Sequence, residues 1–329
     1  MSNIPIGYYT MRILKKPEGK NKGAIILSQV DRVVKQFPFV KDKFYIIERR
    51  GWRGLNESHY ADIKLVEDLS LWKQTLKQFS KSICLDIGPA DFVDTSEFRP
   101  LDIPKRYDAI QISHWSDFKR PELLVKAASL IPNRRFLKLG HFERGGLLEE
   151  RRYRDSIISL SKELGADIIF PYSNAESNND FPRNKGQMNL YFNQSRIGIL
   201  TTKVEGINRF KMECLSSGIP VLIPKDTSYP TKKHINSETG AEFEPTPQGL
   251  VKTIEYVLNN LDKYNPRSYI ERTTGKPIAI SKLKGALEKV CERDCAPYFF
   301  DEIDWDGRNQ SLVWGEDVFR ELKEYETNL

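Results

Sequence analysis

The stretch of residues 197–224, near the middle of the chain, limits the possible folds most strongly. Residues 197–200 form an apolar run that predicts a buried strand, and a polar loop and a helix are expected after it. The helix is expected to end at Gly218, since a glycine C-cap followed by Pro220 prevents its continuation. Residues 221–223 then predict a second buried strand. Strand, helix and strand in this order are typical of an α/β fold with a parallel sheet.

Two glutamates in this stretch, Glu205 and Glu213, suggest a ligand site. Glu205 is expected in the loop before the helix, and the backbone N–H groups of Gly206, Ile207 and Asn208 are expected to be free at the helix start. Such an end attracts phosphate through its donors and the positive end of the helix dipole. A carboxylate on either side of the anion can accept hydrogen bonds from sugar hydroxyls. The pattern therefore predicts a nucleotide-sugar as ligand.

Glu205 and Glu213, together with residues 218–221 (Gly-Ile-Pro-Val), resemble the E-x7-E region of retaining GT-B glycosyltransferases of the GT4-like group. The resemblance extends over roughly residues 110–258. It implies two Rossmann-like domains that face each other across a cleft, with Glu205 beside the donor sugar and Glu213 bound to the nucleotide ribose. The alternative interpretation is a surface helix with two unrelated acidic residues.

A second family motif follows a strand predicted at residues 107–113. In the family, an Arg and a Lys at this turn clamp the donor diphosphate. Lys119 matches the Lys, and a fixed cation at such a turn also suits a phosphate on electrostatic grounds, although a solvated lysine is the alternative. His114 stands where the family has the Arg. The resemblance then implies that Arg120 or Arg209 supplies the missing charge, or that the pyrophosphate is held more weakly.

Two further segments of the second domain stand out, one through the resemblance and one through its composition. Gly140 follows a strand predicted at residues 135–139, where the family often has glycines close to the nucleotide. Residues 171–184 are polar and rich in turn formers, and the sequence leaves open whether they form a mobile lid or an insertion.

Prolines mark the predicted domain boundary. Pro100 and Pro104 punctuate a linker, so residues 1–104 are predicted to form an N-terminal Rossmann-like, acceptor-side domain. Residues 105–313 are predicted to form the C-terminal nucleotide-sugar-binding domain. A final helix at residues 314–326 is expected to brace the first domain. This N-terminal domain is reduced compared with the family, which leaves the acceptor undefined.

The first domain carries weaker signals. A strand at residues 6–14, a Gly/Lys loop at 15–23 and apolar residues at helical spacing over 26–37 predict the beginning of a Rossmann-like half. The loop lacks a GxGxxG pattern, so a plain surface loop is the alternative. Residues 49–54, rich in Arg and Gly, are a candidate recognition loop at the end of a predicted strand. His59 lies just beyond, although a lone His is more often structural.

Composition excludes several classes of protein. The net charge is +6, and the excess of Lys and Arg in the first third predicts peripheral association with an anionic surface, an anionic acceptor or nucleic acid, with a solvated basic face as the alternative. No apolar run reaches the roughly 18 residues that span a bilayer, so no transmembrane segment is expected, and a signal-peptide pattern is lacking. The four cysteines are scattered without metal-site spacing, which predicts a reduced, cytoplasmic protein with no metal.

The predicted function is transfer of a sugar from a nucleotide-diphospho-sugar, with retention of anomeric configuration and without a cofactor or metal. Lys119 and Glu205 are the predicted catalytic residues, Lys119 stabilising leaving-group charge and Glu205 holding the sugar. The predicted donor-binding residues are His114, Arg120, Gly140, Gly206, Ile207, Asn208, Arg209 and Glu213.

Several alternatives to this function stay open. The acceptor is a glycan, a lipid-linked glycan, a protein or modified DNA. Other possible functions are a GT-B epimerase or phosphorylase, a catalytically inactive nucleotide-sugar-binding protein, and a nucleic-acid-associated GT-B protein, including a DNA-modifying glucosyltransferase.

Overall fold

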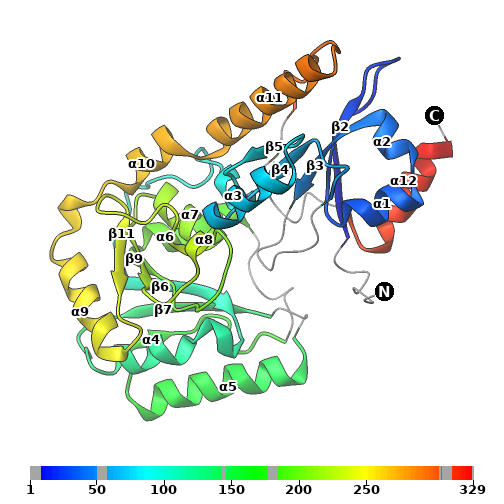
Figure 1. The fold of residues 1–329 in the computed structure, drawn as a ribbon. Helices are drawn as coiled ribbons and strands as arrows, with labels where there is room; N and C mark the ends of the chain where they lie inside the picture. Colours follow the sequence, from blue (N-terminus) through cyan, green and yellow to red (C-terminus); the bar gives the residue numbers. More distant parts are fainter. Residues whose placement is uncertain are drawn as a thin grey trace. The chain divides into compact units, whose positions relative to one another are not determined.

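The computed structural model describes residues 9–49, 58–142, 146–176, 184–303, 305 and 313–327. The chain divides into two compact units: unit 1 comprises Met1–Phe92 and Thr274–Leu329, and unit 2 comprises Val93–Thr273. Among the described residues, each unit contains a six-stranded sheet with helices packed against it (Figure 1). The predicted α/β class is therefore confirmed.

Unit 1 has a mixed sheet. Its strands, in sheet order, are β12 (Val313–Trp314), β1 (Thr10–Lys15), β2 (Gly23–Leu27), β3 (Phe44–Arg49), β4 (Ile63–Leu65) and β5 (Ile83–Leu85). β1 is antiparallel to both of its neighbours, whereas β2 to β5 run parallel. The helices are α1 (Val30–Gln36), α2 (Phe39–Lys43), α3 (Leu69–Gln78), α11 (Lys276–Arg293) and α12 (Glu316–Thr327), with a 3-10 turn at Pro89–Phe92.

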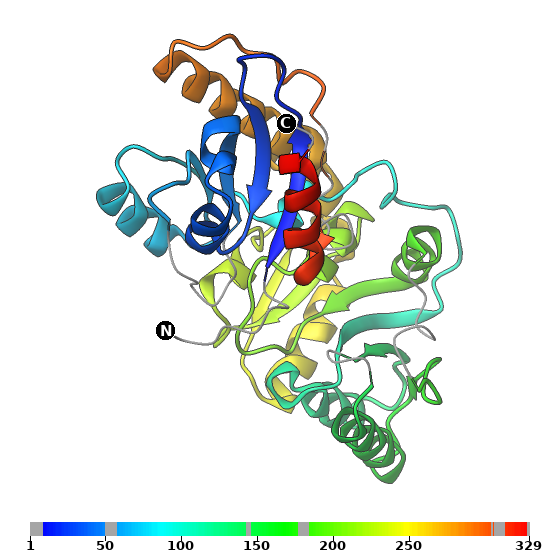
Figure 2. The same ribbon diagram turned by 90° about the vertical axis from the view of Figure 1, so that its right-hand side faces the viewer.

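Both faces of this sheet are covered. One face packs against α11 through Leu283 and Leu287, which are fully buried. The opposite face packs against α1, α2 and the last helix, α12, which lies along the sheet in Figure 2. Val318 and Leu322 of α12 are fully buried, and the ring of Phe319 lies 4.8 Å from that of Tyr9. The final helix of the sequence thus completes the core of unit 1.

The start of unit 1 differs from the prediction. The prediction of a helix over residues 26–37 is wrong at its start, because residue 26 belongs to strand β2 and the helix begins only at Val30. All five residues of β2 are buried, because the strand is covered on both faces. Such a strand is apolar throughout, so its sequence does not show the alternation of apolar and polar residues that identifies a half-exposed strand. The preceding Gly/Lys loop joins two antiparallel strands, so it is a hairpin connection and not a strand-to-helix phosphate loop. The candidate recognition loop at 50–54 lies outside the described residues.

Unit 2 has an entirely parallel sheet. Its strands, in sheet order, are β11 (Gly240–Phe243), β10 (Val221–Pro224), β9 (Ser195–Ile199), β6 (Tyr107–His114), β7 (Phe136–His141) and β8 (Ile168–Ile169). One face packs against α4 (Pro121–Ala128), α5 (Leu148–Glu163) and α9 (Pro247–Leu258). α6 (Lys185–Asn193), α7 (Arg209–Ser216), α8 (Tyr229–Lys232) and α10 (Pro266–Thr273) complete the unit.

The division between the units differs from the predicted boundaries at residues 104 and 313. The segment before Pro104 is bound to unit 2: Arg267 Nη1 donates to Thr95 O and Phe98 O at 2.8 Å each. The backbone N–H of Leu101 also donates to Asn193 Oδ1 at 2.7 Å. At the other end, α11 belongs to unit 1 because its apolar side chains fill that unit's core.

Candidate functional site

Glu205 lies at the carboxyl edge of the parallel sheet of unit 2, in the loop between β9 and α7. The helix begins at Arg209, and the Asn208 side chain caps it by accepting from Lys211 N at 3.0 Å. α7 therefore starts later than predicted, and Gly206 and Ile207 lie in the loop that precedes it. The first-turn N–H groups belong to residues 209–211, and one of them is already bound by the cap.

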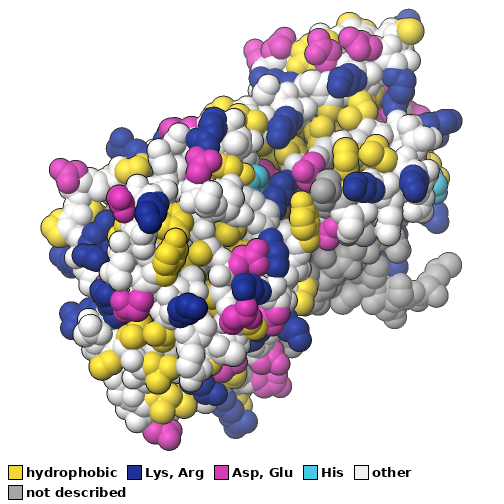
Figure 3. Space-filling view, turned by 60° about the vertical axis from the view of Figure 1, so that its left-hand side comes forward, with side chains coloured by type: hydrophobic (Ala, Val, Ile, Leu, Met, Phe, Trp, Pro, Cys, Tyr) yellow, Lys and Arg dark blue, Asp and Glu magenta, His cyan; other side chains and the backbone are white. Residues whose placement is uncertain are grey.

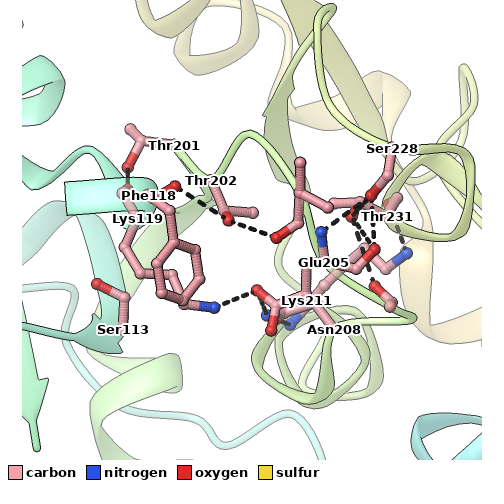
Figure 4. Close-up of polar contacts among 12 residues, drawn as sticks. Ser113, Phe118, Lys119, Thr201, Thr202, Glu205, Asn208, Lys211, Ser228 and Thr231 are labelled. Atoms are coloured by element: carbon pink, nitrogen blue, oxygen red, sulfur yellow. Dashed lines mark hydrogen bonds and ion pairs between the residues drawn. The ribbon is translucent and has the colours of Figure 1, made fainter. Parts of the chain in front are cut away.

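The two predicted catalytic residues are in direct contact (Figure 4). Lys119, from the 3-10 turn Asp117–Lys119, is buried, and its Nζ lies 2.6 Å from Glu205 Oε2. Asn208 Nδ2 donates to the same oxygen at 2.9 Å. The Phe118 ring lies 4.8 Å from Lys119 Nζ and shields it from one side. A lysine, an amide and a partly exposed carboxylate thus form a charged centre at the sheet edge.

Hydroxyl groups near α8 fix the backbone of Glu205. Ser228 Oγ accepts from Glu205 N at 2.9 Å and donates to Glu205 O at 2.5 Å, and Thr231 Oγ1 donates to Glu205 O at 3.1 Å. Lys211, fully buried on α7, in turn holds this segment by donating to Thr231 O at 2.8 Å and to Lys233 O. Glu205 is therefore positioned by α7 and α8 together.

Arg120, one of the predicted phosphate ligands, is already paired. It adopts a left-handed backbone conformation with φ of 49° at the N-cap of α4. Its guanidinium contacts both carboxylate oxygens of Asp226 at 2.8 and 2.9 Å, and its Nε donates to Thr201 O at 2.6 Å. The hydrogen bond from Arg120 is the main cause that lowers the pKa of Asp226 below its usual value. The positive charge of Arg120 is thus largely balanced within the protein.

His114 and Gly140 lie at the ends of adjacent strands. His114 is in register with His141, and the two ring centroids are 4.0 Å apart. Burial, reinforced by Lys119, lowers the pKa of His114 to about 4, so the imidazole is neutral at pH 7. It therefore does not replace the charge of the family's arginine. A Cβ on Gly140 would lie 1.9 Å from the Trp115 ring, so the indole packs directly against this glycine.

The remaining predicted donor residues lie on α7 or just before it. Ile207 is buried, and Arg209 is the first residue of the helix. Glu213 follows Arg209 by about one helical turn and is 9% exposed. The structure thus brings three of the predicted residues into direct contact: Lys119, Glu205 and Asn208. Two others, Arg209 and Glu213, lie on α7, the helix that Asn208 caps.

Several residues of this region were not predicted from the sequence. They are Lys138, Lys211, Asp226, Ser228 and Thr231. The two lysines had a detectable signal, because each interrupts an apolar run of a buried element and charged side chains are rarely buried without a reason. The hydroxyls and Asp226 had none, since they reach the site only through the tertiary structure.

The described segments carry few signs of other sites. None of their helices has both the length and the apolar composition needed to cross a bilayer. Within the same residues, His, Cys, Asp and Glu side chains do not gather in groups of three suited to a metal ion. On the face shown in Figure 3, acidic side chains are interspersed among the basic ones.

No family model matches the sequence, and no curated protein matches it. Solved structures do match. Sucrose-phosphate synthase from Thermosynechococcus elongatus has 15% sequence identity and a TM-score of 0.60, over 80% of this chain and 71% of that chain. HepE from Anabaena, solved with UDP, has 12% identity and a TM-score of 0.61, over 78% and 76% of the two chains.

A glycosyltransferase from Rickettsia africae is similar as well, with 16% identity and a TM-score of 0.56 over 80% of this chain and 79% of that chain. At these identities the likeness shows the fold. The chain has the α/β architecture of GT-B glycosyltransferases, as the sequence predicted.

Proposed function

We propose that this protein is a GT4-like glycosyltransferase that moves a sugar from a nucleotide-diphospho-sugar to an acceptor with retention of anomeric configuration. The supporting observation is the contact between Lys119 and Glu205 at the carboxyl edge of a parallel sheet. Ligands of open α/β sheets bind at this edge. A cation and a carboxylate side by side match the two parts of such a donor, the diphosphate and the sugar.

In this proposal, the bond from the anomeric carbon to the diphosphate oxygen breaks and a bond to the acceptor's hydroxyl oxygen forms on the same face of the sugar. The departing oxygen gains negative charge and takes the proton of that hydroxyl. Lys119 stabilises that charge from a buried position, without a metal or cofactor. Glu205 accepts hydrogen bonds from sugar hydroxyls. Lys119 and Asn208 both bind its Oε2, and no described residue donates to its Oε1, which leaves that oxygen for the sugar.

The donor site then belongs to unit 2. Glu213 binds the ribose, and His114 and Gly140 lie beside the nucleotide. Arg209 and the loop residues Gly206 and Ile207 complete the surroundings of the diphosphate. Unit 1 is the acceptor side, and a glycan, a lipid-linked glycan, a protein or modified DNA are the candidate acceptors. Cys214, Cys291 and Cys295 are free thiols, in keeping with a cytoplasmic location.

The first test is a thermal-shift screen with UDP-, GDP- and ADP-sugars. UDP-sugars come first, because HepE from Anabaena was solved with UDP and glucose. A ligand at about 100 times its dissociation constant adds about 2.7 kcal/mol to the free energy of unfolding. The donor found in this way is then used to measure release of the nucleoside diphosphate and, by NMR, the anomeric configuration of the product.

Glu205→Gln is the decisive variant. We expect it to lower turnover by at least about 100-fold, a loss typical of removing an electrostatic catalytic contact, while the melting temperature stays within a few degrees. Glu163→Gln, on the exposed side of α5, is the matched control and keeps full activity. Equal losses of activity and stability in Glu205→Gln would assign this residue a structural role instead.

A second candidate is a protein that binds nucleotide-sugars without transferring them. It is favoured by the shortage of unpaired positive charge near the predicted diphosphate position. His114 is neutral at pH 7, and Arg120 is paired with Asp226. Donor binding in the screen, without release of nucleoside diphosphate in the presence of any acceptor class, would support this alternative.

A further inference from the structure

Lys138 is a buried lysine that the proposed reaction does not use. It lies on β7 between two apolar residues and is 2% exposed. Its side chain is on the face of the sheet that α4 and α5 cover, next to the Trp115 ring, whose centroid is 4.7 Å from Nζ. No carboxylate contacts Lys138 among the residues that the structure describes. A lysine in such a place needs an explanation, because burial penalises an unpaired charge.

The immediate surroundings of Lys138 suit its charged form. Nζ has three oxygen acceptors: Ser113 Oγ at 2.9 Å, Leu139 O at 3.1 Å and Ser113 O at 3.4 Å. An ammonium group has three N–H donors, and the face of an indole also attracts a cation. Opposing this, burial and then the charge of Lys119 lower the pKa of Lys138 well below its usual value. The cage fits an ammonium, yet the surroundings lack the negative charge that would retain one.

Three unpaired polar atoms lie on β6 or just after it. His114 Nδ1, Ser116 Oγ and Gln111 Oε1 are buried and find no hydrogen-bond partner among the described residues. Gln111 is in register with Lys138, and His114 is in register with His141. Buried polar atoms are normally satisfied, so each of these three atoms has room for a partner that the described residues do not supply.

The titratable groups around Lys138 are mostly basic. Lys119 approaches from the 3-10 turn, His114 from β6, and His141 from the end of β7 itself. Two carboxylates act on these neighbours of Lys138: Glu205 is bound to Lys119, and Glu150 of α5 acts on His114. Glu150 also accepts hydrogen bonds from Gly146 N and Leu147 N. The region therefore has more basic groups than free acidic ones.

We infer that Lys138 is a proton-linked cation beneath the donor site: its amine takes up one proton from solvent when a nucleoside diphosphate docks at the carboxyl ends of β6 and β7, and releases it when the nucleotide leaves. This inference rests on the proposed function and specifies how the diphosphate charge is balanced where His114 replaces the family's arginine. By linkage, nucleotide affinity falls as pH rises, by up to about tenfold per pH unit for one proton.

The test is isothermal titration of the full chain with UDP, GDP and ADP at pH 8. Two buffers with different ionisation enthalpies give the number of protons taken up per nucleotide bound. At this pH the terminal phosphate, with a pKa of about 6, is already ionised, so any uptake comes from the protein. We expect the wild type to take up protons on binding, at most one per nucleotide, and its affinity to fall between pH 7 and pH 9.

Lys138→Met removes the amine but keeps an apolar chain of similar length. This variant is expected to lose the proton uptake and the pH dependence of affinity. Lys126→Met, an exposed lysine on α4, changes net charge equally and is expected to behave like the wild type.

Three results would overturn the inference. Nucleotide binding by the wild type without proton uptake would reject it and leave the proposed function intact. Uptake that persists in Lys138→Met would assign the proton to another group. Failure of all three nucleotides to bind would overturn both the inference and the proposed donor site.

Discussion

At the scale of single residues, the contact between Lys119 and Glu205 has two unequally buried partners. The side chain of Lys119 is 7% exposed and that of Glu205 is 22% exposed. Truncating Glu205 to alanine would leave the buried ammonium with neither a counter-charge nor a hydrogen-bond acceptor on this residue, which destabilises a protein whether or not the pair is catalytic. Glutamine also removes the counter-charge, but its amide oxygen still accepts a hydrogen bond from Lys119, so less stability is lost than with alanine. For this reason Glu205→Gln separates a catalytic role from a structural one.

His114 is expected to make stability depend on pH. Its pKa is about 4 in the folded protein and about 6.5 when unfolded, so the unfolded state binds the proton more tightly. Stability is therefore highest above pH 6.5 and falls as pH decreases towards 4. The loss reaches about 3 kcal/mol, taking about 1.4 kcal/mol per pKa unit. Urea unfolding at pH 7, 6 and 5 measures it.

The matched variant for this prediction is His114→Gln, which has no proton to gain in this range. It should lose less stability than the wild type between pH 7 and pH 5. If the two proteins lose stability in parallel, other groups cause the acid sensitivity.

Gly140 is expected to tolerate no side chain. A Cβ at this position would lie 1.9, 2.0 and 2.4 Å from three atoms of the Trp115 ring, so the indole would have to move. Gly140→Ala should destabilise unit 2 by about 1–3 kcal/mol, as overpacking of a core does. Gly285 on α11 has open space around it, and Gly285→Ala should stabilise by about 0.5–1 kcal/mol through helix propensity. Denaturant unfolding of both variants gives the comparison, and equal effects would contradict it.

At the scale of elements, the start of α7 combines a helix cap with the candidate site. Asn208 caps the helix through Oδ1 and binds Glu205 through Nδ2. We predict that Asn208→Ala costs about 1 kcal/mol of stability and also weakens donor binding and turnover. Thr246→Ala is the matched control, because Thr246 caps α9 in the same way, by accepting from Gly249 N at 3.0 Å, away from Glu205. Urea unfolding and donor titration distinguish the two.

Comparable losses of stability in these two variants, with donor binding weakened only by Asn208→Ala, are the expected outcome. Unchanged donor binding in Asn208→Ala would mean that the amide serves the helix alone. In that case Glu205 would be oriented by Lys119 and its backbone contacts.

Elements with a clear apolar pattern and a clear stop signal were predictable from the sequence. α7 ends as expected, because Gly218 adopts a φ of 83° that other residues rarely reach. β2 was not predictable as a strand, since five consecutive buried residues show no alternation. Lys119 and Glu205 were each predicted from a sequence motif. Their contact was not predictable, because the two residues are 86 positions apart and only the tertiary structure brings them together. The pairing of Arg120 with Asp226 depends in the same way on tertiary structure.

At the scale of the whole molecule, the sequence placed the boundary at the prolines, whereas the structure places it earlier. Arg267, on the last helix of unit 2, contacts Thr95 O, Phe98 O and Ser216 O at 2.8–2.9 Å. One side chain thus ties the first segment of unit 2 to its last helix. Prolines mark a break in regular structure, but they do not show which unit a segment packs against. Here that depends on hydrogen bonds between residues 169 and 172 positions apart in the sequence.

Because Arg267 joins the first segment of unit 2 to its last helix, we predict that unit 2 folds alone. Residues 93–273 are continuous in sequence and have their own core, so a chain of this segment should unfold in one cooperative transition and bind the nucleotide identified for the full protein. Circular dichroism during urea unfolding and nucleotide titration are the measurements. Within this segment, Arg267→Met should cost more than about 2 kcal/mol, because three backbone carbonyls lose a charged donor.

Arg272→Met tests whether this loss is specific to the closing contact. Arg272 lies on the same helix, α10. Its ion pair with Glu238 is exposed to solvent, with exposed side-chain fractions of 49% for Arg272 and 44% for Glu238. Exposed pairs contribute about 0–1 kcal/mol, so this variant should remain close to the wild type. Equal losses in the two arginine variants would show that Arg267 does not close the unit. A segment 93–273 that fails to unfold cooperatively would show that unit 2 needs the rest of the chain to fold.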